Sequence, residues 1–563
     1  MLRFLNIILG ISGMIFLSCA TPGRPGGGPR DETPPVPMHF SPENFSTHFD
    51  AQTIRVQFDE NIQLRNLWQQ IIISPPMARP TIIYNNRNLT ITLQDTLREN
   101  TTYIFSFGNA LVDRNEGNVL YNFQLVFSTG ETIDSLSIMG EIIDAFTLEP
   151  VQNVSIALVA DLDDMFLRDV RPLYIARTNE DGLFQVNFLT CDCFYLVAIN
   201  DRNNDWVYDT ITEEIAFLEF CVPSIFAEMP TFPDTIISEA DSLKLVDSIH
   251  NFLHSGHQML MFRQELPQGV TRSEFTSNAE VAIEFRNPTK NATFRILQPD
   301  PDSIPLELLV NWDNNKQNTQ FFLTELGVRN LWLEVEDGDF LDTLRLLNTH
   351  FQDEPPALRI TLPFGNEMPF FDTFKLAFNV PVREINDTLW LYASDDTIPT
   401  PLTEFSFNET RTKLSFEKEL QQRYSYRLII PDSLIIADFG QTNEDTLTLR
   451  FRVNSPETYT RLELTIHNKP EGQNILQILN ERMEVVEQRI MQSSEEIFTT
   501  LRPGRYRLRL IVDKDENGRW SPGNLRERRQ PEPVFIFYRT LSLQAGWEHV
   551  EEWELRFDSA QRP

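Results

Sequence analysis

Cysteine is scarce in this sequence, since its 563 residues contain only four. A disulfide framework therefore does not define the fold, as it does in small secreted domains. Histidine (8) and glycine (22) are also few, and the sequence contains neither a G-x-S-x-G elbow nor a P-loop. These gaps remove the usual signatures of serine hydrolases and of nucleotide-binding enzymes.

Basic residues are also under-represented. The chain has 48 Lys and Arg against 81 Asp and Glu, which gives a net charge of −33. A field of this sign repels phosphate backbones, so nucleic acid is excluded as an expected partner. The same field suits a solvated protein outside the cytoplasm and attracts divalent cations.

Long hydrophobic runs are missing after residue 19, but the first residues form a short one. Arg3 supplies a positive charge, residues 4–17 are almost all apolar, and Ser18 precedes Cys19. This arrangement is typical of a bacterial secretory signal that ends in a lipobox, so we expect Cys19 to be lipidated and to anchor the chain to a membrane. The alternative is an ordinary cleaved signal with an incidental cysteine.

Most of the remaining chain consists of short runs in which apolar and polar residues alternate. Ile54, Val56 and Phe58 show this pattern, and the runs at 89–93 and 123–127 repeat it. Alternation places one face of a strand in a core and the other face in water. We therefore predict an all-β protein whose first unit is an Ig-like β-sandwich.

The pattern recurs in the second half of the chain, which indicates an internal duplication. The residues Leu414, Phe416, Leu420 and Tyr426 repeat the spacing of Ile91, Leu93, Leu97 and Tyr103. The expected segments are a signal peptide (1–19), a Gly/Pro-rich tether (20–32), a first Ig-like sandwich (33–130), a small β-module (131–225), an unassigned mostly-β domain (226–350), a second Ig-like sandwich (351–455) and a C-terminal β-module (456–563). One short helix is expected at 239–253, and Asp181-Gly182 is expected to form a hairpin turn.

Two stretches resemble known families. Thr33-Pro34-Pro35 and the run from Ile54 to Glu60 resemble the bacterial Ig-like domain of the S-layer-protein (SbsA) type. The segment that begins at Gly140 and continues through Asn179 to Phe184 resembles a carboxypeptidase regulatory-like module. With the anchor at Cys19, the chain is similar to Bacteroidota-type Ig-like-domain lipoproteins. The resemblance implies Ig-like sandwiches that alternate with smaller transthyretin-like β-modules, an outer-membrane location and no catalysis.

Two Asp/Asn-rich turns are the best candidate metal sites, because alternate loop residues can direct hard oxygen ligands at one point. They contain Asp201, Asn203, Asp205 and Asp209 in the first turn, and Asp513, Asp515 and Asn517 in the second. Neither turn has the bidentate Glu at position twelve of a calcium loop, and Trp206 replaces the turn glycine in the first. Calcium is thus one hypothesis, and turns that hydrogen-bond their own backbone are the other.

Three further groups have structural as well as functional interpretations. Cys191 or Cys193 can bridge Cys221, leaving one thiol free, or all three can be small core side chains. His250, His254 and His257 lack a general base and a third ligand, so a solvated helix end explains them better than zinc. The aromatic residues Trp206, Trp520, Trp547 and Trp553 can bind sugars or peptides, although packing is their more ordinary role.

These observations predict a non-enzymatic lipoprotein of the cell envelope that acts as a structural or interaction module. The alternative is a surface lipoprotein that binds a glycan or a peptide. The expected partners are the membrane, through the N-terminal lipid, and an envelope protein or glycan. No cofactor is expected other than calcium. An enzyme in the 226–350 segment would require titratable groups that converge in a pocket.

Overall fold

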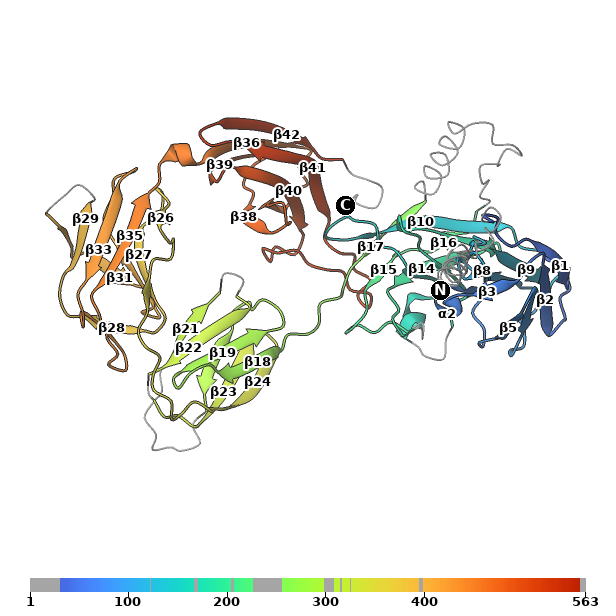
Figure 1. Cartoon of the computed structure of the whole chain (residues 1–563), viewed down its shortest axis with the longest axis horizontal. Coiled ribbons are helices and arrows are strands. Elements are labelled where there is room, and N and C mark those ends of the chain that lie inside the picture. The colour runs from blue at the N-terminus through green and yellow to red at the C-terminus, as the bar shows by residue number, and fades with distance from the viewer. Residues whose placement is uncertain are drawn as a thin grey trace, which may run out of the picture.

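The computed structural model describes residues 31–556, except for 122, 167–170, 204–206, 226–255, 298–307, 314–315, 325 and 394–397. This part of the chain forms 42 strands, one short α-helix, α2 (Leu67–Gln70), and two 3-10 helices, η1 (Leu162–Phe166) and η2 (Pro456–Thr458). None of the helices found there is long and apolar enough to cross a membrane. The prediction of an all-β fold built from tandem sandwiches and smaller β-modules is confirmed (Figure 1).

The first sandwich contains two main sheets around a core of alternating strand residues such as Val56, Phe58 and Phe105. One sheet has the order β1-β2-β6-β5, with β1 (Pro37–Ser41), β2 (Thr53–Phe58), β6 (Asn88–Thr92) and β5 (Thr81–Asn85). The other has the order β4-β7-β9, with β4 (Ile72–Ser74), β7 (Thr102–Ser106) and β9 (Gln124–Ser128), while β3 (Ile62–Leu64) pairs with β8 (Leu111–Asp113).

The second module also has two sheets. The first has the order β13-β10-β17, with β13 (Leu183–Leu189), β10 (Leu136–Asp144) and β17 (His257–Met261). The second has the order β12-β11-β14-β15, with β12 (Tyr174–Arg177), β11 (Ser155–Val159), β14 (Cys193–Ile199) and β15 (Ile215–Phe217), and β16 (Val222–Pro223) also pairs with β14.

Strand β17 corrects the expected end of this module at residue 225. It pairs in parallel with β10, with Ile142 opposite Met259, and both side chains enter the module's core. Residues 257–261 therefore belong to the second module and not to the following domain. The expected helix at 239–253 lies outside the described residues.

The turn at Asp181-Gly182 also differs from expectation. Gly182 has the predicted positive φ, 74°, and a Cβ there would lie 2.6 Å from the carbonyl oxygen of Ile142. However, the flanking strands β12 and β13 belong to different sheets. The turn thus carries the chain across the core and does not form a hairpin.

The third unit is a sandwich whose core includes Phe285, Phe321 and Leu333. Its sheets have the orders β18-β19-β22-β21 and β20-β23-β24. Their strands are β18 (Val270–Phe275), β19 (Glu280–Phe285), β22 (Asn318–Leu323), β21 (Leu308–Trp312), β20 (Thr293–Ile296), β23 (Asn330–Asp337) and β24 (Phe340–Leu347).

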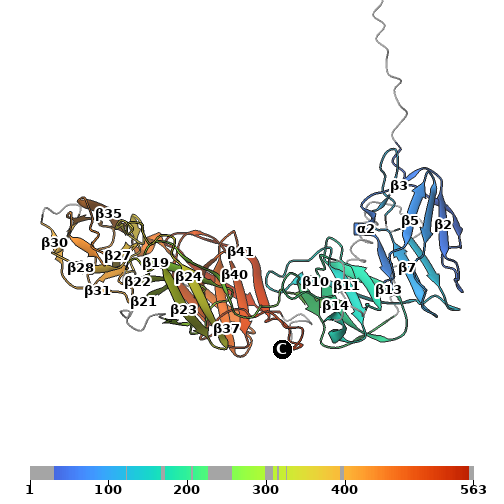
Figure 2. The same cartoon turned by 90° about the horizontal axis from the view of Figure 1, so that it is seen from below.

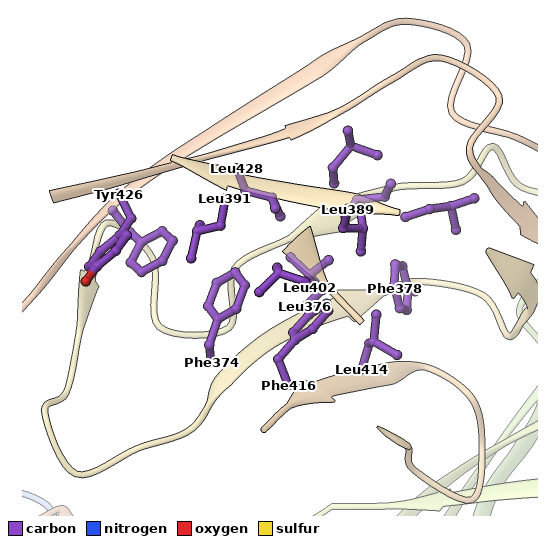
Figure 3. Close-up of a cluster of buried hydrophobic side chains, with 14 of the residues drawn as sticks. Phe374, Leu376, Phe378, Leu389, Leu391, Leu402, Leu414, Phe416, Tyr426 and Leu428 are labelled. Carbon is purple, nitrogen blue, oxygen red and sulfur yellow. The ribbon is translucent and has the colours of Figure 1, made fainter. Parts of the chain in front are cut away.

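The second Ig-like sandwich closes over a core of Phe374, Phe416, Leu391 and Leu428, with side chains from both sheets pointing inward (Figure 3). The sheet orders are β25-β27-β32-β31 and β26-β35-β33-β29-β30, and β28 pairs with β34. The strands are β25 (Ile360–Thr361), β26 (Glu367–Met368), β27 (Phe374–Phe378), β28 (Val382–Ile385), β29 (Leu389–Ala393), β30 (Thr400–Leu402), β31 (Phe405–Phe407), β32 (Lys413–Phe416), β33 (Ser425–Ile430), β34 (Ile435–Ala437) and β35 (Leu447–Val453).

The C-terminal module has the same sheet plan as the second module. Its sheets have the orders β39-β36-β42 and β38-β37-β40-β41, and its first and last strands, β36 and β42, pair in parallel as β10 and β17 do. The strands are β36 (Thr460–His467), β37 (Gln473–Leu479), β38 (Val485–Ile490), β39 (Glu495–Leu501), β40 (Gly504–Asp513), β41 (Val534–Leu543) and β42 (Glu548–Glu554).

Four contacts join the units, and the last of them brings the C-terminal module back to the second module (Figure 1). The first sandwich contacts the second module where Ser74 Oγ accepts the Ile175 N–H at 3.0 Å. Phe439 of the second sandwich packs on the core of the third unit, and Phe371 contacts Tyr459 of the C-terminal module at 5.5 Å. Figure 2 shows the first sandwich at the end of the molecule opposite the second sandwich.

The predicted duplication extends to one hydrogen bond in each sandwich. The Tyr103 hydroxyl accepts the Arg98 N–H at 2.8 Å, and the Tyr426 hydroxyl accepts the Gln421 N–H at 2.9 Å. Each ring stacks on a phenylalanine at 5.6 Å, Phe127 in one sandwich and Phe451 in the other. Both copies thus use a tyrosine to fix the loop before the same central strand.

Replacing either tyrosine by phenylalanine removes the hydrogen bond and keeps the stacked ring. We expect Tyr103→Phe and Tyr426→Phe each to lower the free energy of unfolding of its own sandwich by about 1 kcal/mol. Calorimetry of the full chain should show this loss as a lower midpoint temperature for the unfolding transition of that sandwich. The control Tyr84→Phe alters an exposed side chain of the first sandwich, and an equal loss there would contradict the assignment.

Candidate functional site

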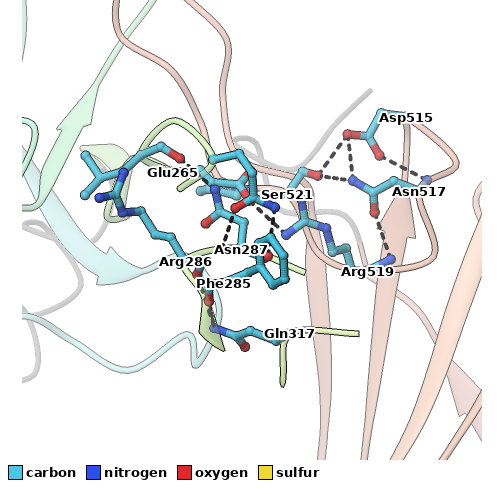
Figure 4. A network of polar contacts seen from close by, with 12 residues as sticks. Glu265, Phe285, Arg286, Asn287, Gln317, Asp515, Asn517, Arg519 and Ser521 are labelled. Carbon is cyan, nitrogen blue, oxygen red and sulfur yellow. Dashed lines mark hydrogen bonds and ion pairs between the residues drawn. The ribbon is translucent and has the colours of Figure 1, made fainter. Parts of the chain in front are cut away.

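The acidic loop of the C-terminal module, residues 513–533, joins β40 to β41 and is rich in hydrogen bonds. Asp513 closes its turn, because Oδ1 accepts the Asn517 N–H at 3.1 Å and Oδ2 accepts the Gly518 N–H at 2.8 Å. Gly518 has φ 79°, which the turn requires. Asp515 Oδ2 accepts hydrogen bonds from the Asn517 amide at 3.0 Å and the Ser521 hydroxyl at 2.9 Å (Figure 4).

Glu532 ties the two ends of this loop together. Its Oε1 accepts the Lys514 N–H at 2.6 Å, and its Oε2 accepts the Ser521 N–H at 2.9 Å. The side chain is only 4% exposed. Burial raises the pKa of Glu532 above its ordinary value of 4.5, although the donated hydrogen bonds act in the opposite direction.

The sequence analysis missed Glu532 because it lies far along the chain from the Asp/Asn run. A signal was present, since Glu532 is a carboxylate two residues before the apolar strand β41. Glu213 stands in the same position before β15 and is 1% exposed. The duplicated modules therefore share a buried glutamate that accepts backbone N–H groups of the loop.

Three carboxylates of the acidic loop converge. Ligand oxygens of Asp513, Asp515 and Glu532 lie within 4.8 Å of one another. Asn517, the third residue expected to bind calcium, uses its side chain within the turn: its Oδ1 accepts the Arg519 N–H at 2.9 Å, and its amide nitrogen donates to Asp515. Calcium takes six to eight oxygens, so three carboxylates provide part of a coordination shell.

The first Asp/Asn turn is arranged differently. Glu213 accepts the N–H groups of Arg202 at 3.3 Å and Asp209 at 3.0 Å. Asp209 accepts the Ile211 N–H at 2.9 Å and the Thr212 hydroxyl at 3.0 Å, and these hydrogen bonds lower its pKa. Asp205 lies outside the described residues. Within the described part of this turn, no three His, Cys, Asp or Glu side chains, Asp201 among them, converge.

The raised pKa of Glu532 predicts a pH dependence. The folded chain holds the Glu532 proton more tightly than the unfolded chain, so this contribution to stability is fully present below about pH 4.5 and is lost as pH rises through the folded pKa. We expect Glu532→Gln to remove this decline from the unfolding free energy of the C-terminal module. Urea denaturation at pH values from 4 to 7 measures the pH dependence of this free energy. The control is Glu516→Gln, which changes an exposed glutamate of the same loop. An unchanged pH slope in Glu532→Gln would contradict this origin.

The acidic loop also forms the junction between the second and C-terminal modules. Leu525, 1% exposed, packs into a cluster of second-module side chains that includes Val197 and Phe262. In the opposite direction, Phe146 and Leu148 of the second module cover the C-terminal sheet at Ile475 and Ile511, a cluster that Trp520 also joins. Each module thus inserts a loop onto the outer face of the other module's sheet.

Close approach and polar contacts complete this junction. A Cβ on Gly523 would lie 2.4 Å from the Phe262 ring, so only glycine fits there without movement. Arg519 pairs with Glu265 at 2.9 Å (Figure 4). Arg528 pairs with Asp161 at 3.0 Å. The Gln530 amide donates to the Phe217 carbonyl at 2.9 Å.

One arginine is buried within the junction. Arg509 is 3% exposed, and its guanidinium lies 4.0 Å from the centre of the Phe146 ring. One of its terminal nitrogens donates to Gln477 Oε1 at 3.2 Å. Burial lowers the pKa of Arg509, while Asp144 nearby acts in the opposite direction. The two modules are therefore also linked by a cation–π contact, to which the C-terminal module contributes Arg509 and the second module contributes Phe146.

A charge placed in the junction should separate the modules. We expect Leu525→Asp to destabilise the docked state by about 2–5 kcal/mol, because it removes a buried leucine and buries a carboxylate. Hydrogen exchange of the full chain should then show faster exchange over the acidic loop and β15. Val550→Asp, at a 67% exposed position of the same module, is the control. Unchanged protection in Leu525→Asp would contradict the junction.

A crevice also lies between these two modules. It has a volume of about 810 Å³ and is lined by Glu141 and Gln258 from the second module and by Phe537, Arg539 and Trp553 from the C-terminal module. Glu141 accepts a hydrogen bond from the Gln258 amide at 2.7 Å. The crevice is mixed in polarity, and its walls come from strands of both modules and from loop residues of the second module such as Leu148 and Asp181.

The cysteines form one disulfide. Cys193, at the start of β14, bonds to Cys221, with their Cα atoms 5.5 Å apart, and Cys191 is free and exposed. Of the two interpretations left open by the sequence, a bridge to Cys221 with one free thiol is correct. The alternative of small core thiols is wrong, because Cys193 and Cys221 are bonded to each other and Cys191 is exposed.

Loss of this disulfide should destabilise the second module. The bond closes a loop with a sequence separation of 28, and in the chain-entropy estimate such a bridge contributes roughly 3–4 kcal/mol. We expect a Cys193→Ser/Cys221→Ser variant to lower the unfolding free energy of this module by about 2–4 kcal/mol. Cys191→Ser is the matched control. Equal stability of the two variants would contradict the assigned pairing.

The remaining candidate residues have structural surroundings or fall outside the described part. His257 lies on β17 and is half-buried, which lowers its pKa, while His250 and His254 are outside the described residues. Trp520 donates to the Glu532 carbonyl at 3.0 Å and contacts Phe146. Trp553 is buried and Trp547 is 61% exposed. Trp206 lies outside the described residues.

Comparison with known proteins identifies the first sandwich. Residues 31–129 match the family model of the bacterial Ig-like domain. No curated protein matches the chain. Similar solved structures include the S-layer protein rSbsC(31-844), at 10% identity, a TM-score of 0.12 and coverage of 84% of this chain and 64% of that chain. They also include the Bacillus anthracis TIE protein, at 9% identity, a TM-score of 0.12 and coverage of 94% and 76%. The first sandwich is therefore similar to the bacterial Ig-like domain family that its sequence resembles.

Proposed function

We propose that this protein is a non-catalytic lipoprotein of the bacterial cell envelope that holds an interaction surface away from the membrane. The observation that carries the proposal is the reciprocal insertion of loops between the second and C-terminal modules. It joins units that are far apart in sequence into one body, as a rigid spacer or display scaffold requires. An Ig-like fold is typical of such structural modules.

Export is supported by two independent features. The N-terminal sequence through Cys19 has the pattern of a lipobox. The Cys193–Cys221 disulfide is of the kind that persists in oxidising compartments such as the periplasm or the cell surface. A tether rich in glycine and proline then separates the anchor from the first sandwich. We place the protein at the outer membrane, lipid-anchored.

The finer assignment of the two smaller modules is also part of this proposal. Their common sheet order and parallel pairing of first and last strands indicate one fold used twice. We assign both to the carboxypeptidase regulatory-like type that the sequence around Gly140 resembles. In this role they are spacers that connect binding or structural units.

Calcium binding at Asp513, Asp515 and Glu532 is a separate proposal. It is supported by the convergence of three carboxylates in a chain with a net charge of −33. Millimolar calcium chloride should then raise the melting temperature of the wild type and not that of Asp515→Asn, with magnesium as the control ion. No shift in the wild type would leave the loop as a purely hydrogen-bonded turn.

Lipid labelling tests the main proposal. The full chain is expressed in a Gram-negative bacterium fed a labelled fatty acid, and intact cells are then treated with protease. We expect label on the wild type and on Cys191→Ser, no label on Cys19→Ser, and cleavage of the anchored chain from outside. An unlabelled wild type in the soluble cell fraction would refute the proposal.

A further inference from the structure

The outer face of one sheet in the second Ig-like sandwich has a charge opposite to that of the whole protein. In the sheet β26-β35-β33-β29-β30, the strand residues include three arginines, Arg427, Arg450 and Arg452, and one carboxylate, Glu367. The chain as a whole has 81 acidic and 48 basic residues. A local excess of arginine on one sheet is therefore a specific feature of this face.

The strand pattern places the arginines outward and together. Tyr426 and Leu428 point into the core (Figure 3), so Arg427 between them points to solvent. Arg427 lies directly opposite Arg450 on β35 and opposite Tyr392 on β29. All three arginines are exposed, and Arg452 is paired in register with Ser425 on one side and Glu367 on the other.

This arrangement is unfavourable without a partner. Like charges directly opposite one another on neighbouring strands destabilise a sheet. Within the described residues, no hydrogen bond or ion pair engages the side chains of Arg427, Arg450 or Arg452. Arg427 instead lies with its guanidinium 5.0 Å from the centre of the Tyr392 ring. A guanidinium stacked in this way keeps the N–H groups at its edge available for a carboxylate.

The first sandwich has different residues at the positions that correspond to Arg427 and Arg450, and its corresponding face is covered. There the equivalent cross-strand pair is Ile104 opposite Val126, and both side chains are buried. The duplicated sheet thus carries an apolar pair where another segment packs on it and an arginine pair where it is exposed. Arginine at these positions is not a requirement of the fold.

The size and chemistry of the face indicate the kind of partner. Five strands of about five residues cover roughly 20 Å by 17 Å, or about 350 Å². A stable protein interface buries about 800 Å² on each partner, so the face is too small for a second folded protein. It is large enough for a few units of a linear chain. Trp390, 38% exposed on the same face as Tyr392, adds an aromatic surface on which a sugar ring can lie.

We propose that this face binds an acidic polysaccharide, with Arg427 and Arg450 pairing with carboxylates and Trp390 and Tyr392 contacting sugar rings. Arg450 also borders a hollow of about 570 Å³ lined by Asn366 and Thr448, which can accept sugar hydroxyls. A polymer with one carboxylate per sugar is less strongly repelled by the acidic chain than duplex DNA, which has one charge per roughly 1.7 Å. The inference deepens the proposed interaction function and does not depend on the lipid anchor.

The test uses the full chain and oligomers of polygalacturonate, with neutral dextran of similar length as the reference. Calorimetric titration should show binding of polygalacturonate that weakens with salt, and no binding of dextran. We expect Arg427→Ala/Arg450→Ala to weaken binding by about tenfold or more, because charge-assisted hydrogen bonds are lost. Arg427→Lys/Arg450→Lys should retain part of the affinity and of the salt dependence.

The matched control is Arg345→Ala in the third unit, where Arg345 lies over the exposed Trp332 at 5.4 Å. It removes an arginine on an aromatic ring elsewhere and should leave binding unchanged. Circular dichroism and melting curves establish that each variant is folded.

Absence of polygalacturonate binding by the wild type, or an equal loss of binding in Arg345→Ala, overturns the proposal. Equal binding of a DNA oligonucleotide, or self-association abolished by the double variant, overturns it in favour of another partner. Since the lipid label on Cys19 is scored separately, failure here is distinguishable from failure of the proposed function.

Discussion

The mutual insertion of loops between the second and C-terminal modules is the contact on which the arrangement of the molecule depends. Leu525 enters the apolar face of one sheet, and Phe146 covers the face of the other. Neither face could remain in water without exposing a contiguous apolar patch. The third unit and the second sandwich, which lie between the two modules in sequence, are thereby held in a closed path. This path consists of contacts between units and of the chain segment that leads from the second module to the third unit (Figure 1).

The acidic loop that supplies Leu525 owes its shape to carboxylates acting on backbone N–H groups. Asp513 closes the turn and Glu532 joins its two ends, so the apolar tip is presented in one conformation. Burying the Glu532 carboxylate is costly, and its raised pKa reflects that burial, to which the neighbouring Asp515 adds a smaller effect. Electrostatics and packing are therefore linked, because the charged part of the loop positions its apolar part.

Much of this fold follows from local patterns in the sequence. Alternation at Ile54, Val56 and Phe58 identifies a strand with one buried face. The spacing of apolar residues that ends at Tyr103 recurs before Tyr426 and identifies the duplication. Features that depend on remote partners could not be predicted in this way. Strand β17 joins β10 after a long intervening segment, and Glu532 reaches back to Lys514. The choice of Cys193 over Cys191 depends on which cysteine lies opposite β16.

The duplicated architecture also explains how one scaffold can have different surfaces. Once core residues and loop tyrosines are fixed, outward positions are free to vary, so Ile104 and Val126 in one copy correspond to Arg427 and Arg450 in the other. The closed path of contacts determines where such a surface is presented. Small-angle X-ray scattering of the intact chain tests that closure most directly. The account predicts one particle with the dimensions of the closed arrangement, independent of salt. An extended string of five separate units, longer by on the order of 30 Å for each released domain, would contradict it.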